Sequence, residues 1–233
     1  MTEQEWLAAD DPRPMLEFLG NQASDRRLWL FACAACRRYS HVFGDAASRT
    51  AVEVGERYAD CRATDTELDD ASNDAFGHRP NFVGREVIGE IAVASAFAVV
   101  NPANRDPNVP AFSTAQAVQR TMDDLGLVAE ICSDRDKPAA ERDPRRAVAV
   151  ERAEQVALLR HIFGNPFRPY AAPASWPSVV VDLAQGLYDG RGDRLIFADA
   201  LEEAGHTELA EHFRAEEWHP KGCWAVDLVL GKG

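Results

Sequence analysis

Apolar residues recur at spacings of three and four along most of this chain, and this period constrains its fold more than any other feature. Residues 25–43 show it most completely, and residues 46–62, 144–162 and 194–204 repeat it. A helix gathers positions with this spacing on one face, which it can bury against its neighbours. In the first of these segments the apolar positions are Leu28, Phe31, Ala32, Ala35 and Tyr39. The period therefore predicts an all-α fold.

Helix start and stop signals flank several of these segments. Thr2 with Glu5, and Thr64 with Glu67, have the spacing of a capping box, in which a hydroxyl and a carboxylate bond each other's backbone amides. Pro144 suits the first turn of a helix. These signals predict helices that begin just after residues 2, 64 and 143.

The segment 222–230 carries a mixed signal. Trp224, Val226, Leu228 and Leu230 alternate as in a strand, whereas Trp224, Leu228 and Val229 fit one face of a helix. We favour a helix because the rest of the chain offers no strand with which this segment could pair.

Prolines divide the chain. Pro166, Pro169, Pro173 and Pro177 crowd residues 165–177, which we interpret as a connector. It separates an N-terminal helical domain of five to seven helices (residues 1–164) from a small helical C-terminal unit (residues 178–233). Residues 133–143 are polar and charged and are predicted to form a mobile linker inside the first domain.

Charge and hydropathy limit the classes of partner. The chain has 38 acidic and 25 Lys or Arg side chains, for a formal net charge of −13. Such a chain repels phosphate backbones, so nucleic acid is not an expected partner and another protein is favoured. The most apolar stretch, residues 87–100, contains Glu90 and is too short to cross a bilayer. With no signal peptide and five irregularly spaced cysteines, we expect a cytoplasmic protein with reduced thiols.

The strongest chemical candidate is a metal site near the C-terminus. His212, His219 and Cys223 follow one another with the spacing His-x6-His-x3-Cys, and imidazole and thiolate are ligands that Zn²⁺ prefers. A structural zinc site needs a fourth ligand. The candidates for this fourth ligand are Cys33, Cys36 and His41, which lie on the helix predicted over residues 25–43. Zinc is therefore a possible cofactor, against the alternative that these are core thiols and surface histidines.

Catalytic alternatives have weaker support. Cys36 or Cys223 could act as a nucleophile with a nearby histidine, but no third group that would orient the histidine is evident. Asp199 with Glu202 or Glu203 would share a helical face and could act as an acid and base, although a solvated face explains them equally. The sequence contains no P-loop, dinucleotide-binding fingerprint or nucleophile elbow. We therefore do not expect an enzyme.

Residues 193–214 read Asp-Arg-Leu-Ile-Phe-Ala-Asp-Ala-Leu-Glu-Glu-Ala-Gly-His-Thr-Glu-Leu-Ala-Glu-His-Phe-Arg. This segment resembles the repeat-companion domain of planctomycete and myxobacterial proteins. The matching residues are Arg194, Leu195, Ala198, Asp199, Leu201, Glu202, Glu203 and Gly205. Ala200 departs from the pattern, because that domain usually has Trp at this place.

Further segments are similar to full-length planctomycete proteins of unknown function. They are Glu5–Leu7, Met15–Leu19, Leu30–Arg38, Ile162–Pro169 and Gly222–Asp227. The resemblance implies a helical protein and brings no known activity. It favours a non-enzymatic interaction or regulatory module, with a zinc-binding protein and an enzyme on a helical scaffold as the alternatives.

Overall fold

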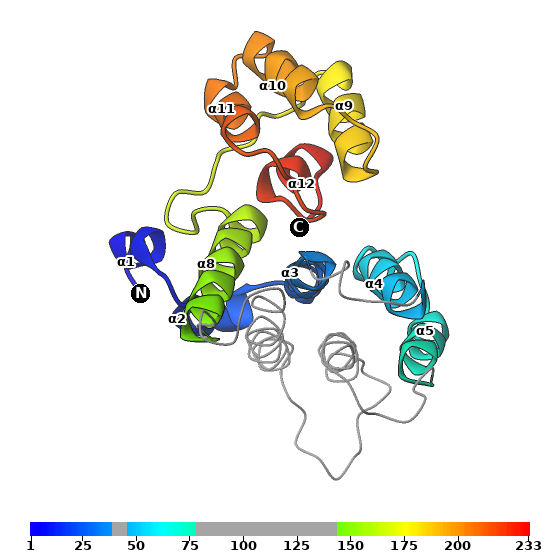
Figure 1. Ribbon diagram of the computed structural model, residues 1–233. Helices are drawn as coiled ribbons and strands as arrows, with labels where there is room; N and C mark the ends of the chain where they lie inside the picture. Colours follow the sequence, from blue (N-terminus) through cyan, green and yellow to red (C-terminus); the bar gives the residue numbers. More distant parts are fainter. Residues whose placement is uncertain (39–45, 78–143) are drawn as a thin grey trace, which may run out of the picture. The chain divides into compact units, whose positions relative to one another are not determined.

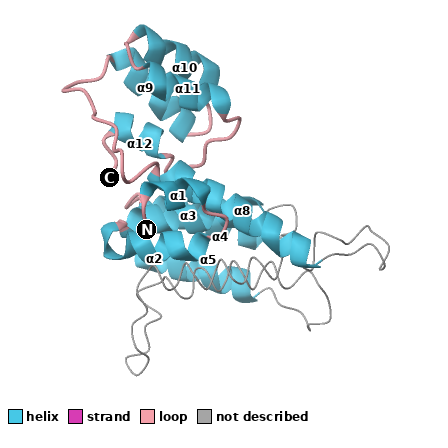
Figure 2. Cartoon of the chain, turned by 90° about the vertical axis from the view of Figure 1, so that its left-hand side faces the viewer, coloured by secondary structure: helices cyan, strands magenta, loops and turns pink. Residues whose placement is uncertain are grey.

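The computed structural model describes residues 1–38, 46–77 and 144–233, and their regular structure is helical throughout (Figures 1 and 2). These residues form ten α-helices and no strand, which confirms the all-α prediction. None of the helices described is long and apolar enough to cross a bilayer. The linker expected at 133–143 and the candidate ligand His41 lie outside the described residues.

The first compact unit comprises Met1–Leu159 and is organised around α3 (Asp25–Arg38). Its other described helices are α1 (Glu3–Ala8), α2 (Pro12–Leu19), α4 (Ala46–Ala59), α5 (Asp65–Gly77) and most of α8 (Pro144–Phe163). Every residue of α3 from Leu28 to Cys36 is buried, so this helix is covered on all sides and forms the core of the unit. α4 packs on both α3 and α5.

Buried carboxylates hold the C-terminal end of α3. Arg37 forms an ion pair with Glu56 of α4, and Arg38 Nη1 lies 2.8 Å from Glu151 Oε2 of α8. Gln155 donates a hydrogen bond of 2.9 Å to the other oxygen of Glu151. A buried carboxylate is tolerated only with such partners.

Local capping signals predicted the helix starts correctly. Thr2 and Glu5 form the expected capping box at the start of α1. The Thr64 hydroxyl accepts a hydrogen bond from the Glu67 amide, and the Glu67 carboxylate accepts one from the Thr64 amide. α8 begins at Pro144.

The second compact unit comprises Arg160–Gly233. It contains the last turn of α8 with α9 (Ser178–Tyr188), α10 (Arg194–Glu203), α11 (Thr207–Ala215) and α12 (Trp224–Leu230). α10 packs on α9 and α11, and α12 packs on α9 (Figure 1). α12 confirms the helical interpretation of residues 222–230.

The division between the units falls inside α8, before the proline-rich residues 165–177. Those residues belong to the second unit because Tyr170 and Trp176 pack against its core. The core draws side chains from all four C-terminal helices, with Phe197 and Phe213 in edge-to-face contact at 4.7 Å between ring centroids. Gly192 permits the tight turn before α10, since a Cβ there would lie 2.5 Å from the amide nitrogen of Leu187.

Candidate metal centre

His212 lies in the last turn of α11. The apolar residues Leu209 and Phe213 bury one side of this helix in the core of the second unit. Arg194 of α10 donates a hydrogen bond of 2.7 Å to the Phe213 carbonyl, which satisfies one of the free carbonyls at the end of α11. The end of α11, and with it His212, is therefore fixed by both packing and hydrogen bonding.

The chain after α11 turns back and brings Cys223 beside two histidines. The Cys223 amide donates to the Pro220 carbonyl at 3.0 Å, and Gly222 adopts a positive φ of 84° within this turn. Cys223 is fully buried at the start of α12. Its Sγ lies 3.3 Å from His212 Nε2 and 3.8 Å from His219 Nδ1. The structure thus brings together the three residues of the His-x6-His-x3-Cys pattern.

His161, in the last turn of α8, completes the group. Its ring centroid lies 5.5 Å from that of His212 and 5.7 Å from that of His219. One ligand atom from each of His161, His212, His219 and Cys223 can be chosen so that all four lie within 4.8 Å of one another. These four residues can therefore hold a metal ion.

Gly164 and Trp224 set the position of the His161 turn. Gly164 ends α8 with a positive φ of 66°, and a Cβ on it would lie 3.0 Å from the Trp224 ring. The Trp224 ring centroid is 5.5 Å from that of His212. The same indole thus contacts the end of α8 and one of the histidines of the group.

Burial determines the protonation of the four side chains. Desolvation, helped by the neighbouring imidazoles, lowers the pKa of His212 to about 3 and that of His219 to about 4. Desolvation also lowers the pKa of His161, against the opposing charge of Glu216. It raises the pKa of the Cys223 thiol to about 12. At neutral pH the three imidazoles are therefore uncharged, as metal binding requires, and the thiol holds the one proton that a metal must displace.

The remaining cysteine candidates lie in the first unit. Cys33 and Cys36 are buried in α3, and desolvation raises the pKa of Cys36 to about 12. Both therefore have the environment of core thiols rather than of reactive nucleophiles. The raised pKa of Cys223 argues in the same way against nucleophilic catalysis by that residue.

Two of the three acidic residues of α10 form surface ion pairs with Arg214 of α11. Arg214 Nη2 lies 2.7 Å from Asp199 Oδ1 and 2.5 Å from Glu202 Oε2. All three side chains are substantially exposed. This arrangement supports the interpretation of a solvated helix face over that of an acid–base pair.

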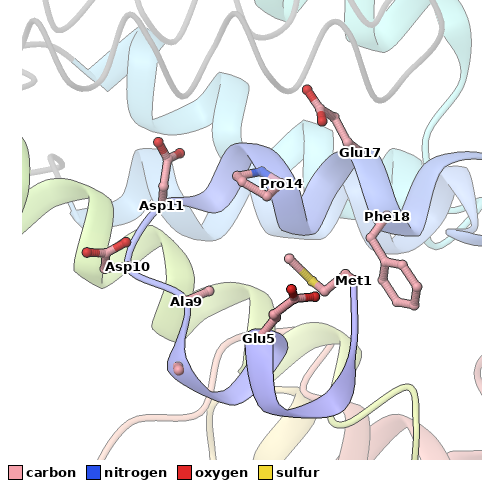
Figure 3. Close-up of a pocket in the computed structure, with 9 residues that line it drawn as sticks. Met1, Glu5, Ala9, Asp10, Asp11, Pro14, Glu17 and Phe18 are labelled. Atoms are coloured by element: carbon pink, nitrogen blue, oxygen red, sulfur yellow. The ribbon is translucent and has the colours of Figure 1, made fainter.

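A pocket in the first unit is lined by α1, α2 and the residues between them, and it carries four carboxylates (Figure 3). They belong to Glu5, Asp10, Asp11 and Glu17. Glu5 accepts a hydrogen bond from the Thr2 amide at 2.7 Å, and Asp11 accepts one from the Arg13 amide at 3.0 Å. Two of the four acids thus cap helix starts, and this pocket offers less chemistry than the His/Cys group.

Sequence spacing did not indicate His161 as a ligand, because it lies far from His212 in the chain, at the end of a helix assigned to a different domain. The available signal was its place in the last turn before Gly164, where a helix must end and a side chain can turn toward the next segment. Comparisons with protein-family models, curated proteins and solved structures found no significant match to this chain.

Proposed function

We propose that this protein binds one structural Zn²⁺ ion through His161, His212, His219 and Cys223. The observation that carries the proposal is the convergence of the four ligand atoms within 4.8 Å. Around a tetrahedral zinc ion with Zn–N near 2.0–2.1 Å and Zn–S near 2.3 Å, ligand atoms lie about 3.3 to 3.6 Å apart. The two distances from Cys223 Sγ, 3.3 and 3.8 Å, lie close to that range.

The donor set favours zinc over the common alternatives. Magnesium and calcium prefer oxygen ligands, whereas a thiolate with imidazoles suits zinc. Four protein ligands fill a tetrahedral shell, which is typical of structural sites, whereas catalytic zinc keeps one position for water or substrate. The proposal is therefore a non-enzymatic role for this ion.

The ion would join three segments that are separate in sequence. His161 comes from the end of α8, His212 from α11, and His219 and Cys223 from the turn that leads into α12. Since α12 otherwise packs mainly on α9, a shared ion would fasten α11 to the start of α12. The predicted result is a C-terminal unit whose folding depends on metal.

Zinc content of the purified full chain tests this proposal. The protein is produced without a histidine tag, incubated with zinc, desalted and analysed for bound metal. We expect about one equivalent for the wild type and for Cys61→Ser, which changes an exposed thiol elsewhere, and less than about a tenth for the double variant His219→Ala/Cys223→Ser. Wild-type protein that retains no zinc would refute the proposal.

A protein-interaction role is the second candidate, and the family resemblance of residues 193–214 supports it. Leu195 and Ile196 in this segment are 48% and 56% exposed, an unusual exposure for two adjacent large aliphatic side chains. A pull-down from a native host with the wild type and with Leu195→Ser/Ile196→Ser tests this role. A partner retained by the wild type and lost by the variant would support it, and background proteins alone would remove its support.

A further inference from the structure

Glu216 touches three of the four residues of the proposed zinc site. It follows α11, where its amide donates a hydrogen bond of 3.3 Å to the His212 carbonyl. Its own carbonyl lies 3.1 Å from His219 Nε2, and its carboxylate oxygen Oε2 lies 3.8 Å from His161 Nε2. One residue thus contacts the backbone of one histidine and the rings of two others.

The contacts of Glu216 with two of the rings favour one ring nitrogen of His219 and one of His161 as the metal ligand. A carbonyl oxygen only accepts hydrogen bonds, so His219 Nε2 carries the proton and Nδ1, the nitrogen nearer Cys223, holds the free lone pair. His161 Nδ1 is buried and has no hydrogen-bond partner, while its Nε2 faces the Glu216 carboxylate. An unpaired buried nitrogen is costly, and a metal ion would supply the missing partner.

We propose that Glu216 is the positioning residue of this site, holding His161 and His219 in the tautomer that presents Nδ1 to the metal. This role rests on the zinc site proposed above and adds the residue that orients its ligands. Metal-bound histidines usually donate their second N–H to a carbonyl or a carboxylate, which fixes the ring and makes the ligand more basic. Glu216 supplies a carbonyl acceptor to His219, at 3.1 Å, and places its carboxylate 3.8 Å from His161 Nε2.

The carboxylate is the part that a substitution can remove, because the backbone carbonyl remains in every variant. His161 is largely buried, with 12% of its side chain exposed, whereas 54% of the Glu216 side chain is exposed. Zinc draws charge from the imidazole, so the attraction between N–H and carboxylate is stronger in the metal-bound state. Loss of such a partner typically weakens metal binding 10- to 100-fold, and the exposure of Glu216 favours the lower end, about tenfold.

Competition with a chromophoric chelator measures the zinc dissociation constant of the full chain. We expect Glu216→Gln to raise this constant about tenfold, and Glu217→Gln, which removes the same charge from the next exposed residue, to leave it unchanged. The metal-free melting temperature of Glu216→Gln should stay close to that of the wild type, since the exposed carboxylate attracts His161 only weakly until zinc is bound. A general structural role would instead lower that temperature.

Nitrogen-15 NMR of the histidine rings gives the second readout. In the zinc form we expect His161 and His219 to be protonated on Nε2 and bound through Nδ1, and His212 to be bound through Nε2. Equal zinc affinity of Glu216→Gln and the wild type, or binding of His161 through Nε2, would overturn the role of Glu216 alone. A wild type that binds no zinc at all would refute the site itself, so the two failures are distinguishable.

Discussion

Removal of zinc should selectively destabilise the C-terminal unit, Arg160–Gly233. The ion would bind three segments of this unit that are otherwise joined by the chain and by a small helical core. The unfolded chain cannot present these four ligands together, so zinc binds the folded state preferentially. All of the binding free energy then contributes to the free energy of unfolding.

The size of the effect follows from mass action. Free zinc at about 1,000 times its dissociation constant stabilises the folded state by about 4.1 kcal/mol. In a folded unit of 60 to 100 residues, the range into which Arg160–Gly233 falls, 1 kcal/mol moves the melting temperature by about 4 to 8 °C. The expected difference in melting temperature between zinc-bound and chelated protein is therefore about 16 to 33 °C.

Differential scanning calorimetry of the full chain measures this shift. One transition should move with free zinc, while the transition of the first unit, Met1–Leu159, stays in place. Cys223→Ser should abolish the shift and Cys61→Ser should retain it. If zinc binds to the wild type but leaves every unfolding transition unchanged, the proposed stabilisation of the C-terminal unit by zinc is refuted.

Three further outcomes follow from the same geometry. Zinc binding at pH 7 should release about one proton, from Cys223, because the three imidazoles are already neutral. Calorimetry in buffers of different ionisation enthalpy measures the number of protons released. Release of two or more protons would contradict these pKa values. Gly164→Ala should lower the free energy of unfolding in urea by about 1–3 kcal/mol, because the new Cβ would crowd Trp224 and the residue would keep a positive φ. Gly231→Ala should cost less, because its Cβ meets no neighbour and only the positive φ is unfavourable. Equal costs would exclude the crowding of Trp224. Glu151→Ala should cost about 3 kcal/mol in the same assay, because it removes the buried carboxylate that pairs with Arg38 and accepts a hydrogen bond from Gln155. A cost below about 1 kcal/mol would show that Glu154, which lies 3.6 Å from Arg38, or water replaces this carboxylate.

The helices could be predicted because their signals are local. The period of the apolar residues, the capping boxes of Thr2 and Thr64, and Pro144 at the start of α8 each act within a few residues. The helix at 222–230 was inferred only from the lack of a strand partner. It packs on α9 and buries Val226 and Val229 in the core of the second unit.

The metal candidate could be predicted only in part. His212, His219 and Cys223 lie within a short segment, where sequence spacing limits how far apart the side chains can be. His161 joins them through tertiary structure, because the left-handed Gly164 ends α8 and lets the chain pack against Trp224. No local pattern encodes that contact, and spacing on α3 pointed to Cys33 and Cys36, which serve as core residues of the first unit.

X-ray absorption at the zinc edge tests the proposed centre most directly, because it measures the ligands around the ion itself. We predict a four-coordinate shell of three nitrogen atoms at about 2.0–2.1 Å and one sulfur atom at about 2.3 Å. Cys223→Ser should lose the sulfur contribution, and Cys61→Ser should keep it. A wild-type spectrum with no sulfur neighbour, or with six oxygen or nitrogen neighbours, would contradict a centre built from His161, His212, His219 and Cys223.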